Sequence, residues 1–182
     1  MNETLKRGIS GSVYVAIVCF SVSYSNPLCS LLFVILGVIS IYEMWKLRKG
    51  KSKLLAFAYI LIPFILVQFI LSNKVQENSN SNLILFMFIL TWTFDTFAYL
   101  LGVKFGKHKI MPSISAKKSW EGFAGGFVFT IIAAYVTSKY LLTIDPQFII
   151  IITALLPFTA TLGDFIESYY KRKAGVKDSG NF

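Results

Sequence analysis

Two acidic residues lie inside apolar stretches of the chain, where a carboxylate is costly. Asp95 interrupts LTWTFDTFAYLLG, and Asp164 interrupts TATLGDFIESYYKRKAG. A charged side chain that faced lipid at such a depth would cost at least about 2.5–3.5 kcal/mol. We therefore expect both carboxylates to face a wet cavity, a cation or a basic partner. Two carboxylates with lysines nearby can hold a hard divalent cation that also carries phosphate oxygens.

A basic segment lies between the two aspartates. It reads GVKFGKHKIMPSISAKKSWEG and includes the adjacent lysines Lys117 and Lys118. The segment is not a P-loop, because its glycine spacing is one residue short and no Ser or Thr follows Lys107. His108 has no nucleophile in view beside it, so we assign it no catalytic role. The lysines would bind phosphate groups or, alternatively, act only as a signal for membrane orientation.

The composition sets the environment in which these residues must work. Of the 182 residues, 55% are hydrophobic and only 15% are charged, and the mean hydropathy is +0.63. A soluble domain of this size could not bury so much apolar surface, and a disordered chain would be far more polar. Despite the net charge of +9, the same figures exclude a nucleic-acid-binding domain. The composition therefore predicts an integral membrane protein.

Six apolar segments are long enough to cross a bilayer, which takes about 20 helical residues. They cover residues 8–24, 28–45, 54–72, 83–101, 122–142 and 148–170. We predict an all-α polytopic transmembrane helical bundle that forms one membrane domain over residues 1–182. Residues 1–72 supply its N-terminal spans, residues 83–182 carry the reactive side chains, and the polar segment 73–82 is the weakest joint. Gly122 and Gly126 form a GxxxG pattern that is typical of close helix packing.

The distribution of charge predicts the orientation of the bundle. Sixteen of the 18 basic residues fall on one side of the six-span topology. The positive-inside rule places that side, with both termini and the 102–121 loop, in the cytoplasm. The fourth and sixth spans then run in the same direction, so Asp95 and Asp164 reach a similar depth and can bound a single pocket. The expected location is a cell membrane, with the bacterial inner membrane favoured and the reactive face toward the cytoplasm.

Two stretches of the chain resemble a known family. DTFAYLLGVKFGKHKIMPSISAKKSWEG and LGDFIESYYKRKAGVKDSGNF are similar to phosphatidate cytidylyltransferase, also called CDP-diacylglycerol synthase. The resemblance is dense over residues 95–126 and 162–182, and extends only to hydropathy over residues 1–90. The pattern GD-x-x-ES-x-x-KR-x-x-GVKDSG is highly specific. Mild departures are Phe97 where Gly is common, Ala116 where Pro is usual, and Ser119 where Thr is usual.

The resemblance implies a nucleotidyltransferase of phospholipid biosynthesis that joins phosphatidate to CTP, giving CDP-diacylglycerol and pyrophosphate. It implies Mg²⁺ or another divalent cation as cofactor, with Asp164 as a metal ligand and Asp95 lining the metal and nucleotide pocket. Lys117 and Lys118 would neutralise the phosphates of CTP or the lipid headgroup. The other residues that the resemblance assigns to the catalytic site are Glu121, Glu167, Lys171, Arg172, Lys177 and Asp178.

One departure from the family concerns the end of the chain. In the family, the KDSG element continues into a further segment with an acidic cluster and a last membrane helix, whereas this sequence stops at Phe182. The expectation is a C-terminally truncated enzyme, because the family's metal site is shared between the residue matching Asp164 and that segment. The activity of the chain as given therefore stays open, and an inactive fragment is one alternative reading.

Two further alternatives differ in chemistry. Another CTP-dependent lipid kinase or transferase of the same superfamily would use a different lipid substrate. A small transporter would use Asp95 and Asp164 as relay groups, but the two halves of the chain lack the inverted-repeat symmetry that many transporters show. The expected partners are phosphatidate, CTP and membrane lipid, with no nucleic acid, and a homodimer is left open.

Overall fold

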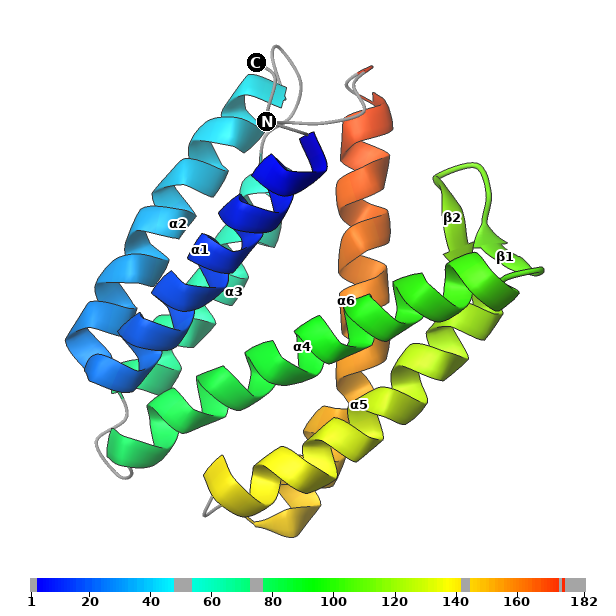
Figure 1. The fold of residues 1–182 in the computed structure, drawn as a ribbon. Coiled ribbons are helices and arrows are strands. Elements are labelled where there is room, and N and C mark those ends of the chain that lie inside the picture. Colours follow the sequence, from blue (N-terminus) through cyan, green and yellow to red (C-terminus); the bar gives the residue numbers. More distant parts are fainter. Residues whose placement is uncertain (1–2, 48–53, 73–76, 142–144, 174, 176–182) are drawn as a thin grey trace. The chain divides into compact units, whose positions relative to one another are not determined.

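The computed structural model describes residues 3–47, 54–72, 77–141, 145–173 and 175, and most of these residues are helical. The helices are α1 (Glu3–Tyr24), α2 (Asn26–Leu47), α3 (Leu54–Ser72), α4 (Glu77–Phe105), α5 (Trp120–Leu141) and α6 (Pro146–Lys173) (Figure 1). A two-stranded hairpin of β1 (Lys109–Met111) and β2 (Ser115–Ser119) lies between α4 and α5. The predicted all-α polytopic architecture is confirmed, and each predicted span falls on a different helix.

The helices have the length and surface of membrane-spanning segments. Four of those described are long and apolar enough to cross a bilayer: Asn26–Lys46, Ser81–Phe105, Trp120–Tyr140 and Pro146–Lys173. Two shorter apolar helical segments cover Gly11–Tyr24 and Ala56–Ser72. Large apolar side chains lie on the outside of these helices, as surrounding lipid would require and water would not favour.

Helix α4 extends beyond the span predicted for it at both ends. It begins at Glu77, inside the segment 73–82 that we expected to be a loop, and it ends at Phe105 rather than at residue 101. The amide of Gly106 still donates a hydrogen bond to the Gly102 carbonyl, with an N···O distance of 3.1 Å. The extra turn moves the C-terminal end of α4 toward the hairpin, and this extension matters for the site described below.

The contacts divide the chain into two compact units. The first contains residues 1–45 and 50–85, and the second contains residues 46–49 and 86–182. In the first unit, α2 and α3 are joined by Ser30 and Gln68, since the Gln68 side-chain amide donates to the Ser30 carbonyl oxygen at 3.1 Å. The expected single membrane domain with a weak joint at residues 73–82 stays a prediction.

The second unit contains α5, α6, the hairpin and most of α4. Phenylalanine rings fill the space between its helices. The ring of Phe123 on α5 lies 5.7 Å from that of Phe94 on α4 and 5.2 Å from that of Phe158 on α6, measured between centroids. The rings of Phe97 and Phe129 stack in parallel at 3.7 Å. Phe97, which stands where the resembled family commonly has Gly, thus packs α4 against α5.

Candidate active site

A cavity of about 510 Å³ lies in the second unit, where α4, the hairpin, α5 and α6 meet. Apolar rings border part of it, and charged and hydroxyl side chains border the rest. The polar side chains that line it come from α4, β1, β2 and α6: Asp95, Tyr99, Lys109, Ser115, Lys117, Lys118, Ser119, Thr161 and Asp164. The cavity therefore collects charged and hydroxyl side chains from four different elements of this unit.

One wall of the cavity depends on close contact between α4 and α5. A Cβ atom added at Gly122 would lie 2.5 Å from the Ala98 carbonyl oxygen and 2.9 Å from the Gly102 Cα atom. At Gly126, the nearest atoms would belong to Phe94, also at 2.9 Å. Real Cβ atoms do not approach other atoms so closely, so only glycine lets the two backbones meet here. The close packing predicted from the GxxxG pattern is confirmed.

Ser119 joins the end of α4 to the start of α5. This residue is only 3% exposed, and its Oγ accepts a hydrogen bond from the Gly122 amide at 3.2 Å. This is the geometry of an N-cap, which satisfies one of the free N–H groups of a helix start. A Cβ atom at Gly106 would lie 2.4 Å from the same Oγ. The close approach of Ser119 therefore requires a glycine at position 106. The hydroxyl of a threonine at position 119 could cap α5 in the same way.

The hairpin has an irregular register at the paired lysines. Lys109 lies opposite Ser119 and Met111 lies opposite Ser115, so three residues of β2 face a single residue of β1. A bulge of this kind redirects side chains that would otherwise alternate between the two faces of a strand. The bulge contains Lys117 and Lys118, and both of these consecutive residues line the cavity. The sequence did not predict this hairpin.

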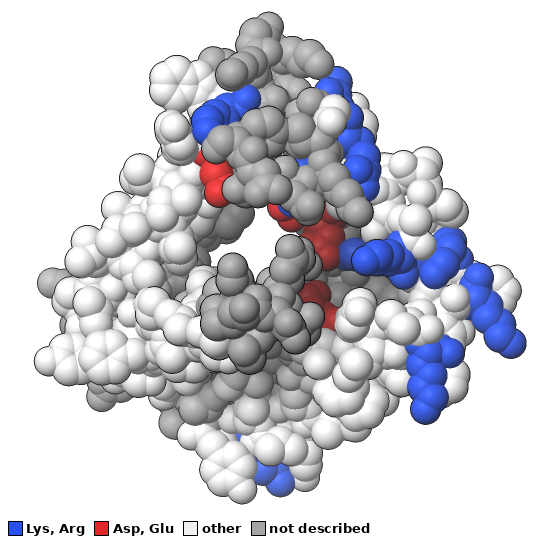
Figure 2. Space-filling view, turned by 45° about the horizontal axis from the view of Figure 1, so that its top comes forward, with Lys and Arg blue, Asp and Glu red and all other residues white. Residues whose placement is uncertain are grey.

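The two aspartates that the sequence analysis singled out also line this cavity. Asp95 comes from α4 and Asp164 from α6, and the Lys118 ammonium forms an ion pair with the Asp164 carboxylate. The Lys118 ammonium also lies 5.3 Å from the centroid of the Phe165 ring. In Figure 2, acidic side chains lie next to basic side chains. The structure therefore brings together Asp95, Lys117, Lys118 and Asp164.

Glu121 has a different place from that expected. Its carboxylate accepts hydrogen bonds from the backbone amides of Lys107 and His108, at 3.1 and 3.2 Å, and contacts the His108 ring nitrogen Nδ1 at 2.6 Å. Glu121 is not among the residues that line the cavity. Its contacts fasten the start of the hairpin to the start of α5.

The remaining residues of the signature fall into two groups. Glu167 and Lys171 form an ion pair one helical turn apart on α6, with an N···O distance of 2.6 Å. Neither of them lines the cavity, and neither does Arg172. Lys177 and Asp178, for which the resemblance implied catalytic roles, lie outside the described residues.

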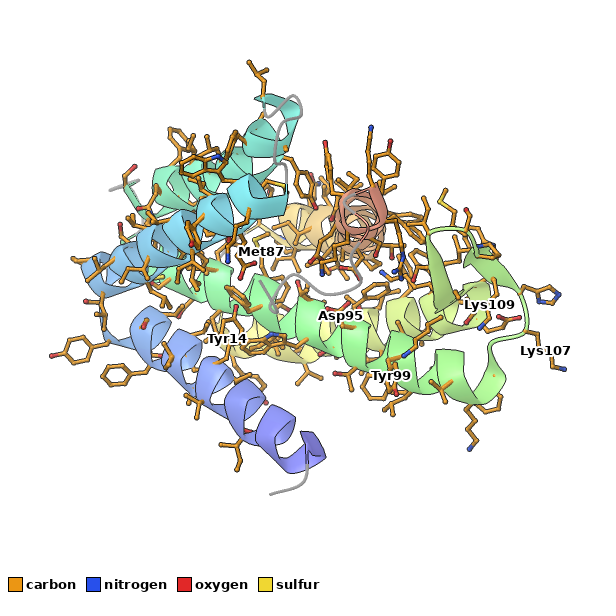
Figure 3. The ribbon with its side chains drawn as sticks, turned by 90° about the horizontal axis from the view of Figure 1, so that it is seen from above. Tyr14, Met87, Asp95, Tyr99, Lys107 and Lys109 are labelled. Atoms are coloured by element: carbon orange, nitrogen blue, oxygen red, sulfur yellow. The ribbon has the colours of Figure 1, made fainter. Side chains whose placement is uncertain are left out.

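Five polar residues of the cavity were not singled out as site residues from the sequence: Tyr99, Lys109, Ser115, Ser119 and Thr161. Tyr99 follows Asp95 by four positions and Thr161 precedes Asp164 by three, so helical spacing places each on the same face as its aspartate. That spacing was a usable signal. Lys109 carried no such signal, because its place depends on a hairpin that the sequence did not predict. In Figure 3, Asp95 and Tyr99 lie along α4, and Lys109 lies at the hairpin.

The carboxylate and hydroxyl oxygen atoms that line the cavity suit a small hard cation that also binds the phosphates of a substrate. Mg²⁺ usually takes one or two protein carboxylates and completes its shell with water and substrate phosphates. Asp95 and Asp164 supply two carboxylates, and Thr161 adds a hydroxyl oxygen. Over the described ranges, no group of three or more His, Cys, Asp or Glu side chains is placed to hold a metal by itself. The residues thus fit a cation that arrives with phosphate rather than a closed structural metal site.

The sequence of this chain is similar to the sequences of known proteins. Residues 48–182 match the sequence profile of the Cytidylyltransferase family. A phosphatidate cytidylyltransferase of Rickettsia bellii is 31% identical over 185 aligned residues, which cover 96% of this chain and 78% of that protein. One from Staphylococcus saprophyticus is 38% identical over 69% of this chain and 48% of its own length.

A higher identity over a shorter stretch is found with phosphatidate cytidylyltransferases of mycobacteria. The protein of Mycobacterium bovis is 41% identical over 106 residues, which cover 58% of this chain. The match spans about a third of the length of that relative, 35%. The profile match covers well over half of the chain and includes every residue of the cavity. The chain therefore belongs to the cytidylyltransferase family.

Proposed function

We propose that this chain transfers the cytidylyl group of CTP to phosphatidate, forming CDP-diacylglycerol and pyrophosphate. The observation that carries the proposal is the cavity in which the lysines of one hairpin face two membrane-helix aspartates. Such a site can hold two polyanions close together, which is the main difficulty of this reaction. Relatives named phosphatidate cytidylyltransferase align with up to 96% of the chain and support the choice of substrates.

The reaction needs no strong general base. A phosphate oxygen of phosphatidate is already anionic and attacks the α-phosphorus of CTP. A new P–O bond forms, the bond from the α-phosphorus to the bridging oxygen breaks, and pyrophosphate leaves with the electron pair. Catalysis then depends on position and on electrostatic stabilisation of the transition state. Lys117 and Lys118 would bind the phosphates, and the ion pair with Asp164 holds Lys118 in place until they arrive.

Asp95 and Asp164 would hold a divalent cation together with the substrate phosphates. When bound, such a cation neutralises phosphate charge and stabilises the leaving pyrophosphate. Without it, two carboxylates facing the same polyanion would oppose binding. Lys118 offsets part of that repulsion, since its ammonium already balances the charge of Asp164. All of these side chains come from a single chain, so the proposed site does not require a homodimer.

The membrane would hold one of the two substrates. Phosphatidate would remain in the bilayer with its headgroup at the surface, and CTP would approach from the cytoplasm. The hairpin follows the apolar part of α4, which ends at Phe105. The excess of lysine and arginine beside the hairpin supports a cytoplasmic position in a multi-pass bacterial inner-membrane protein.

A detergent-micelle assay tests the proposal directly. The purified chain is given phosphatidate, radiolabelled CTP and Mg²⁺, and the formation of labelled CDP-diacylglycerol is measured. Parallel reactions contain diacylglycerol, a polyprenol or an archaeal-type ether lipid as acceptor. Labelled product with phosphatidate alone supports the proposal. Product only with another lipid would assign the chain to a different CTP-dependent reaction, and no labelled product with any of these lipids would contradict both.

A further inference from the structure

Two lysines of the hairpin region have different surroundings, although only one residue separates them. Lys109 is the first residue of β1 and lines the cavity, whereas Lys107 lies before the strand and does not. In Figure 3, the Lys107 side chain points outward from the end of the hairpin. The pair therefore distinguishes a lysine that can reach a bound ligand from one that cannot.

The backbone around Lys109 is fixed from both sides. The Glu121 carboxylate accepts hydrogen bonds from the Lys107 and His108 amides that precede it. The His108 carbonyl accepts a hydrogen bond from the Trp120 amide at 2.9 Å. Lys109 itself pairs with Ser119, whose side chain caps α5. These contacts hold Lys109 at the border of the cavity, so its ammonium is tethered to a rigid frame.

The three lysines of the cavity differ in their charge partners. The Lys118 ammonium is balanced by Asp164. Neither Lys109 nor Lys117 forms an ion pair or a side-chain hydrogen bond with any described residue. Two ammonium groups without such a partner among the described residues thus border the cavity, whereas Lys118 is paired with one of its two carboxylates. A polyanion with separated phosphate groups would satisfy both ammonium groups at once.

The position of Lys109 indicates which phosphate it meets. Asp95 and Gly106 both line the cavity, and the 11 positions from one to the other correspond to about 16 Å along the axis of α4. Lys109 lies beyond Gly106, outside the apolar span that ends at Phe105. A lipid phosphate is tied to the membrane surface, whereas the triphosphate of a soluble nucleotide can extend to this outer end.

We infer that Lys109 is a substrate-binding residue that contacts the triphosphate of the nucleotide, at the end of the cavity far from Asp95. The inference rests on the proposed function, because it takes CTP as the soluble substrate. It adds to the paired lysines Lys117 and Lys118 a third cation, supplied by the opposite strand of the hairpin. Lys109 would hold the part of the nucleotide that leaves as pyrophosphate.

The test compares K109A, K109R and the matched control K107A in the full chain. Equilibrium binding of radiolabelled CTP is measured in detergent, and KM values for CTP and phosphatidate are measured where turnover is present. Loss of one hydrogen bond to a charged group should weaken CTP binding about tenfold or more. We expect this loss in K109A, recovery in K109R, and neither in K107A, with the KM for phosphatidate unchanged. Thermal unfolding curves show whether each variant is folded.

The outcomes separate this inference from the proposed function. If the unmodified chain does not bind CTP, the proposed function fails and Lys109 has no nucleotide to contact. If the unmodified chain binds CTP and K109A binds it within twofold as tightly, the proposed function stands and the inference is wrong. A rise in the KM for phosphatidate with unchanged CTP binding would also overturn it, because Lys109 would then contact the lipid phosphate.

Discussion

The Lys118 ammonium and the Asp164 carboxylate form an ion pair between β2 and α6, although the two residues are 46 positions apart in the chain. The Lys118 side chain is 27% exposed and that of Asp164 is 51% exposed. Pairs with this much exposure usually contribute only about 0.2–1 kcal/mol to stability. The pair is therefore better understood as an arrangement of charge at the cavity than as a clamp that holds the fold.

Asp164→Asn should abolish cytidylyl transfer while leaving the protein folded. The amide keeps the size of the side chain but removes the negative charge that balances Lys118 and that would hold a divalent cation. Divalent-dependent turnover and the thermal unfolding temperature are the two measurements. Asp145→Asn, which lies just before the start of α6 and outside the cavity, is the control. Turnover at the unmodified rate in Asp164→Asn would remove Asp164 from the metal assignment.

Lys117→Ala should raise the KM for CTP, because a free ammonium that borders the cavity is lost. A rise of about tenfold corresponds to the loss of one charge-assisted hydrogen bond. Lys104→Ala is a suitable control, since Lys104 lies in the same basic segment and does not line the cavity. Equal kinetics for both variants would mean that Lys117 serves only membrane orientation.

Glu121→Ala should loosen the start of the hairpin without removing a group from the cavity. The backbone amides of Lys107 and His108 lose their acceptor, and the His108 ring loses its partner. We expect faster hydrogen exchange at these two amides and weaker CTP binding, with partial recovery in Glu121→Gln. Unchanged exchange at both amides would show that other contacts hold this segment.

Glu167→Ala is a useful comparison for that experiment. Glu167 also forms an ion pair, with Lys171, but both members lie on α6 and neither borders the cavity. Its loss should leave exchange in the hairpin unchanged. A similar effect of both variants would indicate a general loss of stability rather than a local role of Glu121.

Gly122→Ala should destabilise the second unit, since the added Cβ would lie 2.5 Å from the Ala98 carbonyl oxygen. Overpacking of this kind costs about 1–3 kcal/mol. Gly11→Ala is the matched control, because nothing lies within 4 Å of a Cβ at that position of α1. Alanine there should be neutral or slightly stabilising, as it is preferred over glycine in helices. Thermal unfolding in the same detergent measures both, and equal shifts would contradict the close contact at Gly122.

The fold was predictable because a bilayer restricts the structures that can cross it. Long apolar runs must become helices, since a bilayer offers no partners for a free backbone. Helix ends were less certain. α4 continues past the predicted residue 101 to Phe105, because Val103, Lys104 and Phe105 are compatible with a helix and Gly106 follows them. The polar segment 73–82 was assigned to a loop on composition, yet α4 begins at Glu77.

The site was predictable in part for a similar reason. The depths of Asp95 and Asp164 in parallel-running spans placed both near one pocket, and the paired lysines were conspicuous in sequence. The position of Lys109 and the hydrogen bonds from the Lys107 and His108 amides to Glu121 could not be predicted from the sequence. Both depend on the backbone of a short hairpin with a bulge. Its strands KIM and SAKKS contain a single β-branched residue and lack the alternation of apolar and polar residues that indicates a strand.

The glycine contact between α4 and α5 also bears on how the cavity could widen. At Gly122 the two backbones touch with no side chain between them, so this wall is stiff. Helix α6 meets α5 through aromatic rings, such as the 5.2 Å contact of Phe123 with Phe158, and it meets β2 through the Lys118–Asp164 pair. Rings can slide and an ion pair can exchange partners, whereas touching backbones cannot part by small steps. We therefore expect the cavity to widen by a tilt of α6 relative to α4 and α5, which would stay in contact with each other. Asp164 would then move with α6, and Asp95 would keep its position on α4.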